Sequence, residues 1–192
     1  MAKARAIPYL HTMRILLRLA ALLALGFSGL VLYGRERMWE KAGPADLGRV
    51  EFDALVRSPT PNDALAATPV LGLDADVALP FYLASPAEVM AAIDAVIARE
   101  GGEVVEATPT LRRVVTRSRV MRFPDTNTIE AVPMEGMGEG GTALRAYARA
   151  TVGQSDFGAN AARLERWLGG LPLPRASVPP ATTAPGGAPA TR

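Results

Sequence analysis

The apolar positions of the chain form one long continuous run, followed by shorter periodic stretches. The run covers residues 15–33 and contains a single charged residue, Arg18. At about 1.5 Å per residue, some 20 apolar residues cross the hydrocarbon core of a bilayer, which is roughly 30 Å thick. The sequence therefore predicts one membrane-spanning helix, which we place at residues 13–34. Arg18 lies close enough to its N-terminal end to reach the headgroups.

The charges that flank this run predict its orientation. Residues 1–33 carry four cations and no acid, whereas the cations that follow the run are partly offset by Glu36 and Glu40. Basic flanks tend to stay in the cytoplasm. We therefore expect a single-pass protein of the inner (plasma) membrane, with a cytoplasmic N-terminus and a periplasmic domain. A cleaved signal peptide is the alternative, but its nearest small-residue cleavage site lies inside the apolar run.

An amphipathic helix is predicted at residues 86–100. Ser85 is a typical N-cap residue, Pro86 suits the first helical position, and Glu88 completes a capping box with Ser85. Gly101 supplies a C-terminal stop. The apolar side chains recur at helical spacing and are Val89, Ile93, Val96 and Ile97.

Beyond Gly101 the apolar positions alternate with a period of two, which is typical of strands. Strands are expected at residues 103–108, 111–123, 128–134 and 142–152, with a turn at residues 124–127. In the last strand small apolar residues alternate with Arg145, Tyr147 and Arg149. This alternation predicts one face on a core and one face open to solvent.

The order of elements predicts an α+β domain at residues 85–171, because a second helix is expected at residues 158–168 after the strands. We expect an antiparallel sheet of about four strands with two helices on one face. Residues 1–12 are a basic N-terminal segment, and residues 35–84 are interpreted as a connecting segment partly packed on the domain. Residues 172–192 are rich in Pro and Ala and are predicted to be disordered.

The composition excludes several classes of site. The chain has no cysteine and a single histidine, His11, which precedes the predicted anchor. Disulfides, thiolate nucleophiles and histidine-based triads or metal sites are therefore excluded from the domain. The net charge is +2, but the excess of positive charge lies in residues 1–33, and residues 85–171 carry ten arginines against eleven acids, so a nucleic-acid partner is not expected. We also expect no cofactor and no metal, and an enzyme is the least favoured class.

Several short motifs resemble those of the DUF1499 family, a bacterial family of unknown function, from about Asp46 onward. The most specific is the string at residues 152–160, in which G-x-S-D-x-G-x-N precedes an amphipathic helix. Weaker matches lie at residues 61–63, 80–81, 117–119, 123–125 and 163–164. The resemblance implies a small extracytoplasmic or membrane-associated domain and no particular reaction. Its motif residues include Asn62, Asp63, Asp125, Gly153, Ser155, Asp156, Gly158 and Asn160.

Arginine is the most suggestive residue type for binding. Residues 112–122 contain five arginines and no acid. If this strand neighbours residues 142–152, the arginines of the two strands share a face and could bind an anionic ligand or a lipid headgroup. The alternative is a solvated face with interleaved acids. The predicted patch consists of Arg117, Arg119, Arg145 and Arg149, with Tyr147 beside them.

Three other motifs have local explanations. Residues 136–141 match G-x-G-x-x-G, but a strand is expected after them, so a hairpin loop is favoured over a dinucleotide site. Ser155 and Asp156 could be a nucleophile and a base, but they are also typical helix caps. Asp63, Asp125 and Asp156 could converge on a metal or act as an acid–base pair, although each is explained by a turn.

The sequence thus predicts a membrane-anchored accessory or binding domain. Its partner would be a membrane-protein complex or an anionic ligand. The first alternative is a domain that binds a lipid or another apolar small molecule in a cavity between sheet and helix. The second is a carboxylate-dependent hydrolase, which requires at least two carboxylates to meet in a cleft.

Overall fold

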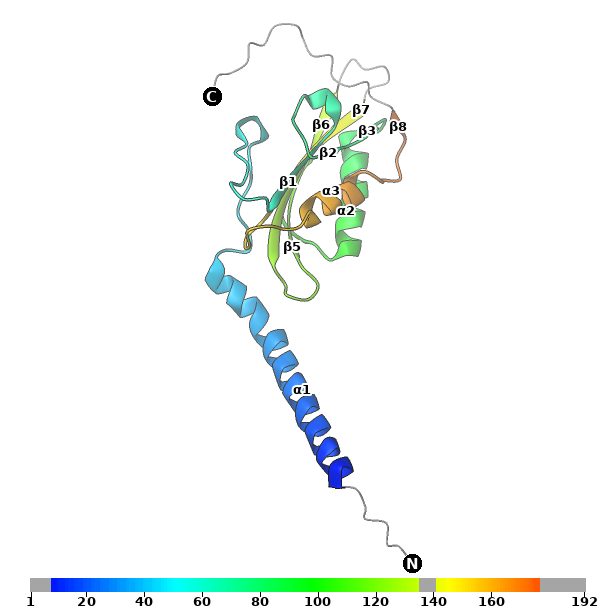
Figure 1. Cartoon of the computed structure of the whole chain (residues 1–192). Coiled ribbons are helices and arrows are strands. Elements are labelled where there is room, and N and C mark those ends of the chain that lie inside the picture. Colours follow the sequence, from blue (N-terminus) through cyan, green and yellow to red (C-terminus); the bar gives the residue numbers. More distant parts are fainter. Residues whose placement is uncertain (1–7, 135–140, 177–192) are drawn as a thin grey trace, which may run out of the picture.

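The computed structural model of the protein describes residues 8–134 and 141–176. The predicted glycine-rich loop, apart from Gly141, and the predicted tail from residue 177 onward lie outside the described residues. The described chain consists of one long N-terminal helix and an α+β domain (Figure 1). The predicted α+β class is therefore confirmed, whereas the sheet differs from the prediction.

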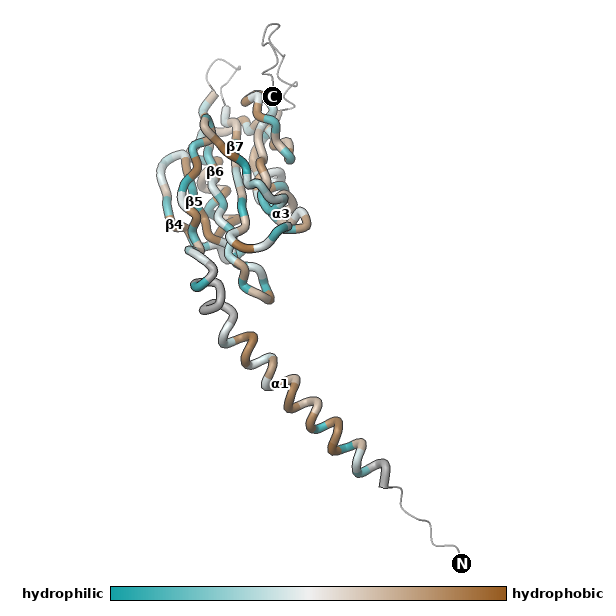
Figure 2. The backbone as a smooth tube through the Cα atoms, turned by 60° about the vertical axis from the view of Figure 1, so that its left-hand side comes forward, coloured by the Kyte–Doolittle hydropathy of each residue, from teal (hydrophilic) through white to brown (hydrophobic). Residues whose placement is uncertain are grey.

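The N-terminal helix α1 (Pro8–Ala42) extends away from the domain as a separate rod (Figure 1). Its segment His11–Gly34 is long and apolar enough to span a membrane, and none of that segment is buried against the domain. Figure 2 shows the apolar residues distributed along this rod. The predicted apolar helix is confirmed; a signal sequence would share its length and composition.

The domain is built on one mixed sheet of eight strands. The path runs β2-β1-β7-β6-β5-β4, while β3 pairs with β7 and with β8. β1 and β2 are parallel, and the other pairs are antiparallel. The strands are β1 (Asp63–Ala67), β2 (Val77–Ala78), β3 (Phe81–Tyr82), β4 (Glu103–Ala107), β5 (Leu111–Arg117), β6 (Pro124–Met134), β7 (Gly141–Ala150) and β8 (Arg175–Ala176).

The prediction of about four antiparallel strands was wrong in size and in type. Four further strands come from residues 63–82 and 175–176, and one of them introduces the parallel pair. β1 is rich in alanine, which has little intrinsic preference for strands, so its conformation depends on pairing with β2 and β7. β6 also begins at Pro124, where a turn was predicted, because proline is tolerated as the first residue of a strand.

The two helices of the domain lie where the sequence predicted them. α2 (Pro86–Glu100) has the expected capping box between Ser85 and Glu88, and it ends at Gly101 with φ 73°. α3 (Ala159–Leu168) begins one residue later than predicted, and its N-cap is Gly158 rather than Ser155 or Asp156. Asp156 nevertheless accepts hydrogen bonds from the backbone N–H groups of Gly158 and Asn160.

Both helices pack on one side of the sheet, which we call the inner face (Figure 1). Short side chains on the central strands let the helix backbones approach closely, and every one of them is buried. These side chains belong to Ala64, Ala66, Ala146 and Ala148. Large apolar residues of the helices fill the remaining space, and they include Met90, Ile93, Leu164 and Trp167.

The opposite side of the sheet, the outer face, is not open as the alternation in β7 predicted. Residues 44–58, with the 3₁₀ turn η1 (Phe52–Ala54), cross it, and Phe52 packs on Leu65 and Tyr147. Tyr147 is only 1% exposed as a result. The alternation in β7 indicates that its two faces differ in polarity. It cannot predict that a segment from a distant part of the sequence covers one of them. A second 3₁₀ turn, η2 (Pro69–Leu71), follows β1.

Candidate functional site

The chain passes from α1 into the domain at one end of the sheet, which we call the α1-proximal end. The backbone N–H of Leu47 donates to Oγ1 of Thr126 (2.9 Å), near the start of β6. A Cβ placed on Gly43 would lie 3.8 Å from the Thr151 side chain, just after β7. This end therefore carries the β5–β6 turn, the exit of β7 and the loop that leads to α3 (Figure 1).

A buried polar cluster lies on the inner face at this end. The guanidinium of Arg163 donates to Asp125 (2.6 Å), to Asn160 (2.7 Å) and to Asn127 (3.2 Å). The side chains of Arg163 and Asp125 are only 13% and 11% exposed. We call these four residues the Arg163 cluster. Because the charges and amide oxygens share one guanidinium, the cluster fixes α3 against β6.

The cluster continues into the loop before α3 through Asn62. The Asn62 side chain donates to the carbonyl oxygen of Gly153 (2.8 Å), and the Asn160 side chain donates to the carbonyl oxygen of Asn62 (3.2 Å). The backbone N–H of Asp156 donates to the carbonyl oxygen of Pro61. The entry to β1, the β7–α3 loop and the start of α3 are thus tied together by side-chain amides.

The electrostatics of this cluster are dominated by burial. Burial raises the pKa of Asp125, the ion pair with Arg163 opposes the rise, and the nearby carboxylate of Asp156 adds to it. Loss of the Arg163 guanidinium would leave the Asp125 carboxyl buried without its favourable partner and would raise its pKa further.

A second group of polar side chains lies on the outer face. Arg57 makes a bidentate ion pair with Asp63 (2.8 and 3.1 Å) and also donates a hydrogen bond to Asp76 (2.8 Å). The Tyr147 hydroxyl donates to Asp63 (2.6 Å) and accepts from the backbone N–H of Ser58 (3.1 Å). Burial, together with the hydrogen bond to Asp63, raises the pKa of Tyr147 to about 12. Burial would raise the pKa of Asp63, but its donors outweigh burial and hold it below its usual value.

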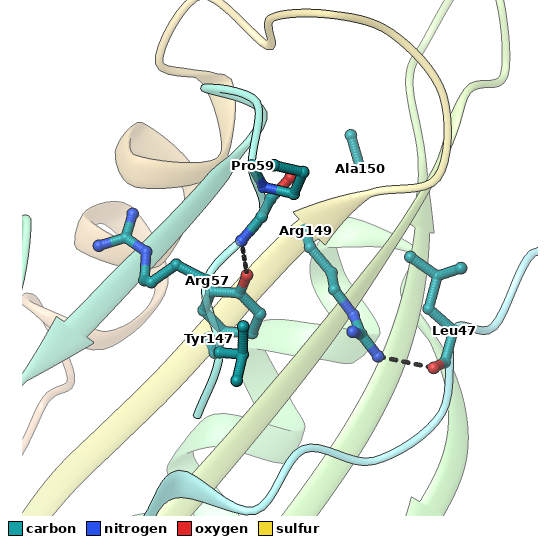
Figure 3. A pocket seen from close by; sticks show the side chains of 8 residues that line it. Leu47, Arg57, Pro59, Tyr147, Arg149 and Ala150 are labelled. Atoms are coloured by element: carbon teal, nitrogen blue, oxygen red, sulfur yellow. Dashed lines mark hydrogen bonds between the residues drawn. The ribbon is translucent and has the colours of Figure 1, made fainter. Parts of the chain in front are cut away.

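A pocket of about 300 Å³ opens beside this group (Figure 3). The Arg149 guanidinium faces it and donates to the carbonyl oxygens of Leu47 (2.6 Å) and Gly48 (3.2 Å). Within the described parts of the chain, Arg149 has no carboxylate partner. The residues that line the pocket are Leu47, Val56, Arg57, Ser58, Pro59, Tyr147, Arg149 and Ala150.

A single family match covers these motif residues and all of the pocket lining except Leu47. A family described as "Protein of unknown function (DUF1499)" matches residues 56–171. The chain belongs to the DUF1499 family. The match confirms the resemblance noted in the sequence, and it extends from the segment that precedes β1 to the residues that follow α3. Searches of curated proteins and of solved structures give no match.

The DUF1499 motif residues are divided between the two faces of the sheet. Asn62, Asp125, Gly153, Asp156 and Asn160 meet around the Arg163 cluster, and Gly158 caps α3. Ser155 lies in the same loop, where its hydroxyl accepts from the Phe157 N–H. Asp63 points to the outer face with Tyr147.

The three aspartates proposed for a metal or acid–base site therefore do not converge. Asp63 is held on the outer face, whereas Asp125 lies in the Arg163 cluster on the inner face. Both oxygens of Asp156 accept backbone N–H groups at the start of α3. Among the residues that the structure describes, no group of three His, Asp or Glu side chains could hold a metal ion. These three side chains therefore do not form the carboxylate site that the hydrolase alternative proposed.

The predicted arginine patch is only partly assembled. Arg117 and Arg149 lie on the outer face toward the α1-proximal end, and Arg119 is exposed in the turn after β5. Arg145 is on the same face but farther along β7, where Glu130 (2.7 Å) and Asp53 (2.8 Å) neutralise it. Its guanidinium also lies over the ring of Phe52.

Two arginines with central roles, Arg57 and Arg163, were not among the predicted site residues. A signal for Arg163 was present, because Asn160, Arg163 and Trp167 follow the helical spacing of the buried stripe of α3. A cation on an apolar stripe indicates a buried acidic partner. Arg57 lies in a segment without periodic pattern and carried no comparable signal.

Proposed function

We propose that this DUF1499 protein is a membrane-anchored binding protein that takes up a small anionic ligand in the pocket beside Arg149. The observation that supports this most directly is the state of Arg149. It lines the pocket, it is bonded only to two carbonyl oxygens within the described chain, and its charge is not neutralised there. A carboxylate or phosphate group can displace the carbonyl oxygens from a guanidinium, because its bidentate, charged hydrogen bonds are stronger.

The pocket has a mixed lining in which Arg149 supplies the charge. Arg57 pairs with Asp63 and Asp76, so it forms part of the pocket wall and supplies no free charge. The hydroxyl of Ser58 donates to the Asn62 side chain, and the apolar part of the lining comes from Leu47, Val56, Pro59 and Ala150. The space between sheet and helices, where an apolar ligand was considered, holds packed core side chains in the described domain.

The anchor in this proposal is α1, with the N-terminus in the cytoplasm and the domain in the periplasm. The basic flank before the apolar segment supports this orientation. Because the chain has no cysteine, Val56→Cys gives a unique thiol at a side chain that is 85% exposed. A maleimide that cannot cross membranes should label it in intact cells whose outer membrane has been permeabilised. Labelling only after cell lysis would refute the periplasmic placement.

Binding can be measured on the full-length protein in nanodiscs, with inorganic phosphate and succinate as probes. We expect saturable binding of at least one probe by calorimetry. Arg149→Gln should weaken it about tenfold or more, because a hydrogen bond to a charged group contributes roughly 1.5–3 kcal/mol. Arg99→Gln is the matched control, since Arg99 is exposed on α2 and does not line the pocket.

The outcomes distinguish the anion pocket from the lipid-binding and accessory-subunit alternatives. Equal binding by the Arg149 and Arg99 variants would place the anion elsewhere and refute the pocket. A phospholipid that co-purifies in stoichiometric amount, with no response to either probe, would favour the lipid-binding alternative. A stoichiometric membrane protein recovered from native membranes would favour the accessory-subunit role.

A further inference from the structure

Phe157 combines two features that a water-facing domain does not favour. Its side chain is 97% exposed, and its backbone lies in the left-handed region with φ 53°. A bulky residue with positive φ is rare, and the conformation costs free energy. Local hydrogen bonds to Ser155 and Asp156 fix the loop in this shape. The fold therefore holds an aromatic ring outward at a strained position.

The loop that carries Phe157 lies at the α1-proximal end of the domain. It connects β7 to α3, and its first residue, Thr151, donates its backbone N–H to the carbonyl oxygen of Pro124 at the start of β6 (3.0 Å). Gly43, the first residue after α1, is next to the Thr151 side chain. The loop that carries Phe157 therefore lies on the side of the domain from which α1 departs (Figure 1).

The β5–β6 turn at the same end supplies positive charge. Arg117 and Arg119 show no carboxylate partner in the described parts of the chain, and Arg119 is exposed. Val120, between these arginines and the start of β6, is 69% exposed. Arginine beside exposed apolar side chains matches a bilayer interface, where anionic phosphates lie above acyl chains.

The length of α1 places this end close to the headgroups. α1 continues for two turns beyond Gly34, where the apolar segment ends, which is roughly 12 Å. The headgroup layer occupies about 5–8 Å on each side of the hydrocarbon core. The domain therefore begins just above the lipid surface, and an ordinary helix tilt of about 20° lowers one side of it into the headgroups.

We propose that Phe157, Arg117 and Arg119 form a second contact between the domain and the membrane. The phenyl ring enters the headgroup layer, and the arginines pair with the phosphates of anionic phospholipids. The contact fixes the orientation of the domain on the lipid surface. It rests on the membrane anchoring in the proposed function but is independent of the anion pocket.

The absence of cysteine permits a site-specific test. An environment-sensitive fluorophore is attached to Phe157→Cys in full-length protein, reconstituted into nanodiscs of phosphatidylcholine with or without phosphatidylglycerol. Leu83→Cys is the matched control, because Leu83 is an exposed apolar residue next to β3, which pairs with the opposite end of β7. The label at 157 should show blue-shifted emission and quenching by lipids spin-labelled near the headgroup, more strongly with phosphatidylglycerol. The label at 83 should show neither.

Replacing both arginines (Arg117→Gln with Arg119→Gln) should abolish the difference between the two lipid compositions. If the label at 157 behaves like the label at 83 in both nanodiscs, while the protein stays with the disc, the contact is refuted and the anchor stands. If the protein elutes without the disc, the anchor is refuted and the contact with it.

Discussion

Arg163→Met tests whether the Arg163 cluster holds α3 on the sheet. Methionine replaces the unbranched stem of the arginine side chain and removes its guanidinium, so Asp125 is left buried without its partner. Removing one member of a buried ion pair typically costs about 3–5 kcal/mol. Since small domains have a free energy of unfolding of roughly 5–15 kcal/mol, we expect a folded but much weakened protein.

The assay is urea unfolding of full-length protein in detergent, followed by tryptophan fluorescence, because Trp167 is buried on α3 and reports its release. Arg166→Met is the matched control on the same helix. Arg166 is 55% exposed and forms a surface ion pair with Glu100, so its loss should cost less than about 1 kcal/mol.

Two further measurements test whether the lost stability comes from leaving Asp125 without its partner. In an Asp125→Asn background, Arg163→Met leaves no unpaired carboxylate behind, so it should cost at least about 1 kcal/mol less than in the wild type. Burial raises the pKa of Asp125, so acidification neutralises it in the variant, and the cost of the substitution should shrink as the pH falls. A cost similar to that of the Arg166 control, or one independent of Asp125 and of pH, would refute the reasoning.

Three other predictions concern single side chains. Burial would raise the pKa of Asp63, but its hydrogen-bond donors hold that pKa below the usual value. The contribution of Asp63 to stability is therefore present above about pH 4 and is lost as the pH falls through the pKa of the folded state. Asp63→Asn should make the fall in Tm with decreasing pH less steep. An equally steep loss would contradict this. Phe157→Gly should stabilise the domain in detergent by about 0.5–1 kcal/mol, because relief of the left-handed strain exceeds the entropy cost of glycine; a destabilised variant would show that the ring packs within the domain. A Cβ at Gly141 would lie 2.6 Å from a carbonyl oxygen of β3, so Gly141→Ala should cost about 1–3 kcal/mol in urea unfolding, whereas Gly170→Ala, with open space around it, should be nearly neutral.

Local signals in the sequence predicted local structure well. The capping box and Gly101 predicted the two ends of α2, and the period of two predicted where the long strands lie. Both signals depend only on residues that are close in the sequence. β1 was missed, since its strand conformation depends on pairing with β7 far along the chain. The same limit applies to the outer face, where alternation grouped Arg145, Tyr147 and Arg149 but could not predict the segment that covers them.

The candidate site was predicted in part for a similar reason. The family motifs identified Asn62, Asp125 and Asn160, which meet in the structure. Their common partner, Arg163, depends on which side of α3 faces the sheet. Whether Arg149 has a carboxylate partner likewise depends on acids from other segments, and two of these acids, Asp53 and Glu130, pair with Arg145 instead.

The pairing of β1 with β7 has a consequence for biosynthesis. Asp63 and Tyr147, which are hydrogen-bonded across these strands, are 84 residues apart in the sequence. β1 therefore has no long neighbour until most of the domain has been made and, in the proposed topology, translocated. During that interval α1 can already be inserted, while β1 remains an unpaired strand that is prone to incorrect pairing and aggregation. In the proposed topology, the inserted α1 would hold the unfinished chain at the bilayer until β7 is made and completes the sheet.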